Sequence, residues 1–243
     1  MNGYLSSRVK RLFFRAGFEV IRLENSHSTI ANTLNLIRVS MADVMIDVGA
    51  NIGQFAREVL YLTTGIRIVS FEPLSQAHRH LTLKAANESR WLIAPRKALG
   101  STEDTATLNI ARNFASSSIL PMQKAHLRAA PQSVYVGTEE VPVKRLDAVM
   151  HTYCRPNDKL YLKIDTQGYE SQVITGAAGI MDRIFAIQLE ASFVELYTKQ
   201  KLAFEMIYDV QQLGFKLFGI SHELQDPASG ELLQANVYFV RSV

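Results

Sequence analysis

The chain has 243 residues, of which 47% are hydrophobic and 20% are charged, a composition typical of a globular protein with a sizeable core. Its net charge of +3 is confined to residues 1–25, so the rest of the chain is neutral, which argues against a broad nucleic-acid-binding surface. No apolar run reaches the length of a membrane helix, and the single cysteine, Cys154, excludes an intrachain disulfide and a cysteine zinc site. We therefore expect a cytoplasmic protein.

The N-terminal part of the chain differs from the rest in its charge. We expect residues 1–40 to form a basic helical arm and residues 41–243 to form one domain. Within residues 4–22, apolar side chains fall on a helical stripe with arginines opposite it. Such a helix either packs on the domain as an accessory element or rests on an anionic membrane surface. The second alternative would place the protein at the inner face of the membrane.

From residue 43 onwards, short apolar segments alternate with amphipathic ones. Strands are predicted at 43–48, 67–72, 91–99, 159–165, 184–190, 215–221 and 235–241, and helices at 53–64, 74–89, 169–177 and around 200–213. This alternation is typical of a mostly parallel sheet that is covered by helices on both faces. The last two strands are joined by a loop that contains the sequence DPASG, so we expect an antiparallel strand at the end of the sheet.

The alternation weakens between residues 100 and 158. Strands are predicted within 105–111 and 139–147, and residues 112–138 form a long excursion between them. Loops of this length in compact domains are usually functional or mobile. We expect this segment and the loop at 222–234 to shape a binding pocket.

The sequence DVGANIG, from Asp47 to Gly53, joins a predicted strand to a predicted helix through a glycine turn. This is how open parallel sheets bind nucleotides, beyond the carboxyl ends of their strands. Gly49 and Gly53 would let the backbone approach a ligand with no Cβ in the way, and the helix start would offer free N–H groups. Asn51 stands where the dinucleotide fingerprint has its middle glycine, so a pyrophosphate would lack its cradle.

The next predicted strand ends in the sequence FEP, which places Glu72 25 residues after Asp47. A carboxylate there can accept two hydrogen bonds from ribose hydroxyls. Asp47, Gly49 and Glu72 together suit S-adenosylmethionine, with the ribose on Glu72 and the amino-acid portion over the glycine turn. Leu99, after the third strand, either contacts the adenine or belongs to the core.

The sequence YLKIDTQGYE places Asp165 at the end of a buried strand, with Gln167 and Glu170 in the turn and helix start that follow. In a parallel sheet this strand end faces the same crevice as the glycine turn. Asp165 could take a proton from an acceptor hydroxyl, and Glu190, at the end of the next strand, is the second candidate. Alternatively, Asp165 caps a helix and Glu170 stabilises its N-terminus. The two carboxylates lack a convincing third ligand, so we expect no metal.

Further polar residues near these strand ends are candidate contacts to the acceptor. Ser117 and Ser118, in the long excursion, could donate hydrogen bonds to a polar acceptor or to the cofactor carboxylate, although an ordinary turn explains them equally well. Tyr169 could stack on a sugar ring. Gln167 and Glu170 complete the predicted substrate-binding set.

Eight segments carry a family resemblance, and they occur in the family's order: DVGANIGQFA, SFEPLS, KALG, ASSSIL, LKIDTQGYE, IQLEASFVELY, LGFKLFGI and LLQANVYFVR. Over residues 44–241 the chain resembles the FkbM family of S-adenosylmethionine-dependent methyltransferases. The resemblance implies an α/β fold of class I methyltransferases, a Rossmann-like doubly wound sheet, mostly parallel, of seven strands with the last antiparallel. The family most often has an aspartate where this chain has Asn236, so no role of that aspartate carries over.

The resemblance also implies the chemistry. We expect S-adenosylmethionine as cofactor and O-methylation of a hydroxyl on a sugar, a glycan or a glycolipid, with 2-O-methylation of fucose on a Nod factor, in nodulation, as one specific candidate. The alternatives are an O-methyltransferase of a small secondary metabolite and a non-catalytic methyltransferase-like binding domain. We expect no nucleic-acid partner, because base-methylating enzymes typically carry an Asn/Asp-Pro-Pro-aromatic turn where this chain has DTQG. Neither the acceptor nor the oligomeric state follows from the sequence.

Overall fold

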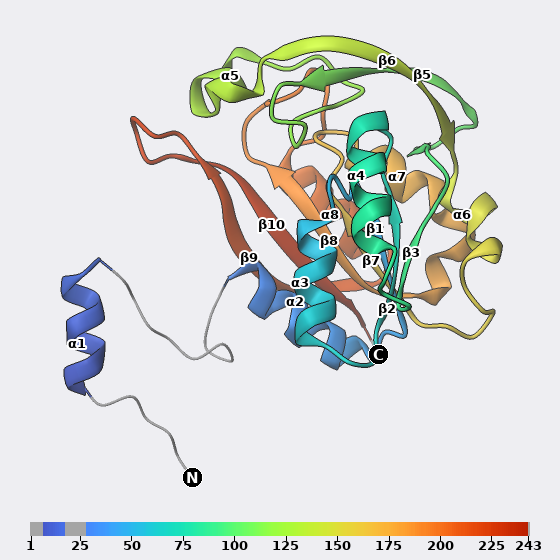
Figure 1. The fold of residues 1–243 in the computed structure, drawn as a ribbon, viewed down its shortest axis with the longest axis horizontal. Coiled ribbons are helices and arrows are strands. Elements are labelled where there is room, and N and C mark those ends of the chain that lie inside the picture. Colours follow the sequence, from blue (N-terminus) through green and yellow to red (C-terminus); the bar gives the residue numbers. More distant parts are fainter. Residues whose placement is uncertain (1–6, 18–27, 243) are drawn as a thin grey trace.

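The computed structural model describes residues 7–17 and 28–242, so parts of the predicted N-terminal arm lie outside the described residues. Helix α1 (Ser7–Arg15) is the first described element, and α2 (Thr29–Ser40) precedes the sheet (Figure 1). Across the part of the chain that is described, no helix is both long enough and apolar enough to cross a membrane.

Seven strands form the central sheet, in the order β3-β2-β1-β7-β8-β10-β9 (Figure 1). Their bounds are Val44–Val48 (β1), Arg67–Phe71 (β2), Trp91–Ile93 (β3), Leu160–Ile164 (β7), Ile184–Ser192 (β8), Phe215–Gln225 (β9) and Leu232–Arg241 (β10). Strand β10 is antiparallel to both of its neighbours, and the remaining pairs are parallel. The predicted seven-stranded, mostly parallel sheet with an antiparallel last strand is therefore confirmed.

Helices cover both faces of the sheet because successive side chains of a strand point to opposite faces. On β1, Met45 packs with α2, α3 and α4, whereas Val44 and Ile46 pack with the helices of the opposite face. The helices on the two faces, besides α2, are α3 (Gln54–Leu62), α4 (Ser75–Ala85), α6 (Leu146–Val149), α7 (Glu170–Gly176) and α8 (Ala203–Gln212). Short 3-10 helices occur at Pro131–Ser133, Met150–Thr152 and Ala178–Arg183.

Helix α2 lies within the segment predicted as an arm, yet it packs on the central sheet. Leu36 is buried in the core, and the Thr33 hydroxyl donates a hydrogen bond to Gln188 Oε1 of β8 at 3.1 Å. The hydroxyls of Thr29 and Ser221 of β9 lie 3.0 Å apart and share a hydrogen bond. Ile30 and Ile37 also pack against the apolar cluster that contains Leu36, so apolar and polar contacts together hold α2 on the sheet.

A second, three-stranded sheet is inserted between β3 and β7. Its strands are β4 (Ala98–Leu99), β5 (Asp104–Ala111) and β6 (Tyr135–Lys144), in the order β4-β6-β5. The prediction of one strand at 91–99 is wrong, because this segment divides into β3 of the central sheet and β4 of the inserted sheet. Pro95 lies between them, and a proline has no N–H group to continue a strand ladder.

The inserted segment arches over one end of the central sheet (Figure 1). Helix α5 (Lys124–Ala129) connects β5 to β6 and contacts the loop that follows β8. The Gln123 amide donates to the Leu196 carbonyl at 2.8 Å, and the rings of His126 and Tyr197 lie 5.1 Å apart. The insertion is thereby held against the loops at the carboxyl ends of the central strands.

Candidate functional site

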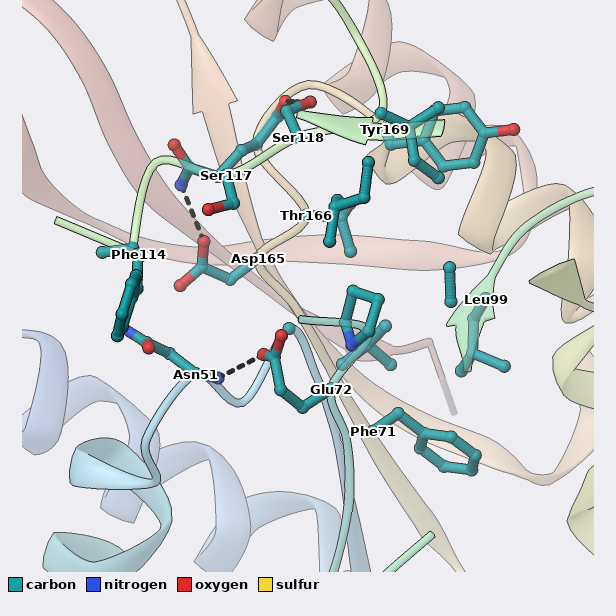
Figure 2. A pocket seen from close by; sticks show the side chains of 18 of the residues that line it. Asn51, Phe71, Glu72, Leu99, Phe114, Ser117, Ser118, Asp165, Thr166 and Tyr169 are labelled. Atoms are coloured by element: carbon teal, nitrogen blue, oxygen red, sulfur yellow. Dashed lines mark hydrogen bonds between the residues drawn. The ribbon is translucent and has the colours of Figure 1, made fainter. Parts of the chain in front are cut away.

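A pocket opens at the carboxyl ends of the central strands, between them and the inserted sheet (Figure 2). Its lining comes from the ends of β1, β2 and β7, from β4 and from the turn after β5. Open α/β sheets bind their ligands at this edge, where the strand order reverses.

The two glycines of the turn after β1 are required by the protein's own packing. Gly49 has φ +75°, and a Cβ there would lie 1.8 Å from the Asp165 carbonyl oxygen. Gly53 has φ +81°, and its Cβ would lie 2.5 Å from the Trp91 ring and 2.7 Å from the Leu81 side chain. The expectation that both leave room for a ligand is corrected, because protein atoms already occupy that space. Gly49 does line the pocket, but Gly53 is absent from its lining.

Asp47 is fully buried and does not line the pocket. Its Oδ2 accepts a hydrogen bond from the Ser70 hydroxyl at 3.0 Å, and its Oδ1 lies 3.1 Å from the Lys163 ammonium. The predicted direct role in cofactor binding therefore has no geometric support. Asp47 instead holds a buried cation beneath the pocket.

The Lys163 ammonium is a feature that the sequence analysis did not single out. It lies 3.1 Å from Asp47 Oδ1 and 3.4 Å from Asp165 Oδ2, and only 6% of the side chain is exposed. Burial by itself would lower the pKa of Lys163, but the charges of Asp47 and Asp165 outweigh it and the pKa is raised. The lysine therefore stays cationic. A lysine inside the apolar run YLKID is a signal that could have revealed it.

Glu72 lines the pocket and is almost completely buried. One carboxylate oxygen accepts a hydrogen bond from the backbone amide of Asn51 at 2.6 Å (Figure 2), and the other accepts one from the backbone amide of Leu74 at 2.7 Å. Burial raises the pKa of Glu72 to about 7, although both amides act in the opposite direction. Each oxygen keeps a second lone pair that can accept a further hydrogen bond.

Asp165 and Glu190 are joined through the side-chain amide of Gln167. The Gln167 Nε2 group donates to Asp165 Oδ1 at 2.9 Å and to Glu190 Oε2 at 2.5 Å, and its Oε1 accepts from the Tyr197 hydroxyl at 2.6 Å. Asp165 lines the pocket, whereas Glu190 is buried and does not. Burial, together with the charge of Asp165, raises the pKa of Glu190. Tyr197 was not predicted as part of this group.

The remaining predicted site residues divide into two groups. Those that line the pocket are Asn51, Leu99, Ser117, Ser118, Gln167 and Tyr169. Glu170 is buried outside the lining, where it accepts hydrogen bonds from the Thr166 amide at 2.9 Å and the Gly168 amide at 3.1 Å. Burial raises the pKa of Glu170 to about 7. Glu170 therefore braces the turn after β7, and contact with a substrate has no geometric support.

The two predicted serines differ in how their hydroxyls are used. The Ser118 hydroxyl donates to the Gln167 carbonyl at 2.7 Å, so its proton is engaged within the protein. The Ser117 hydroxyl accepts from the Ala111 amide at 3.0 Å, which leaves its proton for a molecule in the pocket. Ser117 is therefore the better donor to a ligand.

Backbone strain concentrates at this pocket. Five non-glycine residues of the described chain have positive φ, and three of them line the pocket: Asn51 (49°), Phe114 (60°) and Gln167 (55°). Such conformations persist where the surrounding structure enforces them, and they cluster at functional sites. Phe114 was not predicted, because no local pattern marks an aromatic residue for this conformation. Within the described residues, no group of three or more histidine, cysteine or acidic side chains is arranged to hold a metal ion.

A family model described as the methyltransferase FkbM domain matches residues 47–217. The chain belongs to the FkbM methyltransferase family. This match confirms the resemblance that the sequence motifs carry, and it identifies the protein as a methyltransferase with S-adenosylmethionine as its cofactor. No curated protein matches the chain significantly.

Solved structures of other methyltransferases resemble the protein at low identity. An rRNA methylase from Streptococcus thermophilus is 10% identical, with a TM-score of 0.48 over 92% of this chain and 99% of that chain. Aeropyrum pernix fibrillarin with bound S-adenosyl-L-methionine is 11% identical (TM-score 0.46, 86% of this chain and 74% of that chain). Magnesium protoporphyrin IX methyltransferase from Synechocystis, with bound cofactor, is 10% identical (TM-score 0.44, all of both chains). At these TM-scores the similarities carry no argument about acceptor or mechanism.

The groups that line the pocket suit S-adenosylmethionine. Glu72 has lone pairs for hydroxyl groups, and Phe71 and Leu99 provide an apolar surface on one side of it (Figure 2). On the other side lie Asn51 and Asp165, and Asn51 Oδ1 is buried with no hydrogen-bond partner among the described residues. A flat apolar base, a ribose and a charged amino-acid end would each meet a matching surface.

The role of Gly49 can be tested by replacing it with alanine. An L-residue at this φ costs about 1–2 kcal/mol, and the overlap with the Asp165 carbonyl adds to that cost. We expect Gly49→Ala to lower the free energy of unfolding by more than about 2 kcal/mol, measured by urea denaturation. Gly65→Ala is the matched control, because a Cβ at Gly65 meets no atom within 4 Å. Equal stability of the two variants would contradict the packing argument.

Proposed function

We propose that the protein is an S-adenosylmethionine-dependent O-methyltransferase that methylates a hydroxyl of a sugar, a glycan or a glycolipid. The observation that carries the proposal is the Asp165 carboxylate, which lines the pocket beside the turn after β5 and is backed by the buried Lys163 ammonium. The fucose 2-hydroxyl of a Nod factor is the first specific acceptor to test. A small hydroxylated metabolite is the alternative acceptor, and a non-catalytic binding domain is the alternative function.

The pocket residues divide the work of holding the cofactor. Glu72 accepts hydrogen bonds from the ribose hydroxyls, and Phe71 and Leu99 contact the adenine. Asn51 and Gly49 line the part of the pocket assigned to the amino-acid portion. When bound, the cofactor supplies a methyl group on a positively charged sulfur. The protein then has to align the acceptor oxygen with it, and such positioning can supply ~7–11 kcal/mol of barrier reduction.

Asp165 is the proposed base. A sugar hydroxyl is a weak acid, so a neighbouring group has to accept its proton as the oxygen takes the methyl group. The Asp165 side chain is 35% exposed, so an acceptor can reach it, and Gln167 and Lys163 hold its two oxygens in place. Glu190 has no access to the pocket, and its raised pKa favours a neutral carboxyl group. We assign Glu190 to positioning Gln167.

Cofactor binding should depend on the protonation state of Glu72. Its pKa of about 7 means that the carboxyl group is largely protonated near pH 6 and ionised near pH 8. The ionised carboxylate accepts hydrogen bonds on both oxygens, whereas the protonated form carries a hydrogen on one of them. We expect the affinity for S-adenosylmethionine, measured by isothermal titration calorimetry, to rise between these pH values.

Variants of Glu72 provide the controls for this titration. Glu72→Ala should weaken binding by about ten- to a hundredfold, because hydrogen bonds to charged groups contribute ~1.5–3 kcal/mol. In Glu72→Gln, the rise in affinity with pH should be smaller than in the wild type. If Glu72→Ala binds S-adenosylmethionine as tightly as the wild type does, the ribose does not bind at Glu72.

A separate prediction concerns Asp165 and catalysis. Asparagine keeps the size of the side chain but cannot accept the proton, so Asp165→Asn should lower methyl transfer by at least about a hundredfold. Glu190→Gln is the matched control, and we expect it to reduce transfer by less than tenfold because Glu190 lies outside the pocket lining. Glu190→Gln should bind the cofactor within a few-fold of the wild type. Asp165→Asn also removes a negative charge from the pocket, so methyl transfer is compared at saturating S-adenosylmethionine. Full activity of Asp165→Asn would assign the base to another residue.

The acceptor can be identified with a labelled methyl donor. Fucosylated glycans, lipid-linked sugars, small hydroxylated metabolites and RNA form the arms of the screen, with wild-type protein and Asp165→Asn compared in each. Label transferred by the wild type to a sugar hydroxyl would support the proposal. Transfer to RNA alone would overturn it, and cofactor binding with no transfer to any arm would favour the non-catalytic alternative.

We also propose that residues 4–22 contact an anionic membrane. The protein would then be cytoplasmic and would act at the inner face of that membrane. Side chains of α1 support this, because Leu12 and Phe13 of the apolar stripe are 69% and 41% exposed on a helix that also carries Arg11 and Arg15. Residues 4–6 and 18–22 lie outside the described residues. In co-sedimentation, full-length protein should bind vesicles containing phosphatidylserine, whereas a variant lacking residues 1–22 should not. Equal binding of both would contradict the proposal.

A further inference from the structure

Phe114 lines the pocket in a backbone conformation that bulky side chains rarely adopt, with φ +60°. The turn that contains it is closed by backbone hydrogen bonds. The Phe114 amide donates to the Ala111 carbonyl at 3.0 Å, and the Ser117 amide donates to the Phe114 carbonyl at 3.0 Å. A strained residue held in this way at a pocket wall points to a role for its side chain there.

The same turn is tied to the loops that carry Asp165 and its partners. The Ser118 hydroxyl donates to the Gln167 carbonyl at 2.7 Å. The Ser116 carbonyl oxygen lies 3.2 Å from the Tyr197 hydroxyl oxygen, whose proton is donated to Gln167 Oε1. The Phe114 ring therefore has a defined place relative to Asp165. It belongs to a preformed wall of the pocket.

The two sides of the pocket differ in polarity (Figure 2). Phe71 and Leu99 lie on one side of Glu72, whereas Phe114 and Asp165 lie on the other. With the ribose at Glu72, the flat adenine suits the apolar side. The opposite end of S-adenosylmethionine carries a sulfonium, an ammonium and a carboxylate group, with a net charge of +1, and its two cationic groups are attracted to the Asp165 carboxylate. The Phe114 ring therefore lies on the side of the pocket that would receive the cationic end.

We propose that Phe114 is a cofactor-specificity residue that contacts the sulfonium end of S-adenosylmethionine and favours it over the product S-adenosylhomocysteine. This inference rests on the proposed placement of the cofactor in this pocket. The face of an aromatic ring attracts a cation, most strongly where water is excluded. The product differs from the donor by one methyl group and has an uncharged sulfur. The ring thus holds the charged donor and releases the neutral-sulfur product more readily.

The test compares the affinities of the two ligands by isothermal titration calorimetry. Phe114→Leu keeps an apolar side chain and the same backbone strain but removes the aromatic face. We expect the affinity for S-adenosylmethionine to fall by about three- to tenfold, the range of a cation–π contact at a partly exposed site. The affinity for S-adenosylhomocysteine should change by less than about twofold. Phe114→Tyr keeps an aromatic face and should retain the wild-type ratio of the two affinities.

Two controls isolate the effect of the ring. Phe193→Leu removes a ring outside the pocket lining, one that packs against Phe204 at 5.9 Å, and it should leave the ratio unchanged. Thermal unfolding without ligand shows whether each variant is folded. If Phe114→Leu does not fold, Phe114→Met serves as the second non-aromatic variant.

The outcomes separate this inference from the proposed function. If Phe114→Leu has the wild-type ratio of the two affinities, the specificity role is overturned while the cofactor site stands. This includes the case in which both affinities fall by the same factor. Wild-type protein that binds neither ligand overturns the cofactor site and this inference with it. Loss of the ratio in Phe114→Leu, with retention in Phe114→Tyr, supports the role of the aromatic face.

Discussion

The close approach of the ends of β1 and β7 is the constraint on which the pocket depends. A Cβ at Gly49 would lie 1.8 Å from the Asp165 carbonyl oxygen, so the two turns can touch only through a glycine. The Lys163 ammonium sits beneath this contact, 3.1 Å from Asp47 and 3.4 Å from Asp165. Without that cation, two carboxylates would face each other in a region of low dielectric, which is costly. Packing and charge balance together thus place the Asp165 carboxylate at the pocket.

Around this contact, buried acidic groups differ in what they contact. Glu72 and Glu170 are both almost fully buried, and burial raises the pKa of each to about 7. Glu72 lines the pocket, whereas Glu170 accepts hydrogen bonds from backbone amides of the turn after β7. Glu190 is separated from Asp165 by the Gln167 amide, which donates to both carboxylates. One edge of the sheet therefore holds acidic groups in three settings: Glu72 lines the pocket, Glu170 is bonded to a turn, and Glu190 is linked to Asp165 through an amide.

The inserted sheet completes the site with residues distant in sequence from the strand ends. Its turn after β5 brings Phe114 and Ser117 to the pocket, and the Ser118 hydroxyl fixes that turn to the Gln167 carbonyl. The His126 ring of the insertion lies 5.1 Å from the Tyr197 ring and adds a second contact. Since the central sheet is shared by many methyltransferases, selectivity has to reside in such added segments. The strained conformation of Phe114 is consistent with a wall that is assembled before any ligand arrives.

Local patterns in the sequence were enough to predict the central sheet, its direction and the strand ends that carry Glu72 and Asp165, because alternation and strand-end position are local properties of a chain. They failed at Pro95, where one apolar run serves two sheets, and they did not predict that α2 packs on the sheet through Leu36 and Thr33. Only the tertiary structure decided that Asp47 holds Lys163 and that Phe114 lines the pocket. These roles arise from contacts between segments far apart in the chain. Such contacts depend on how loops pack over the sheet, and no spacing within a single segment encodes them.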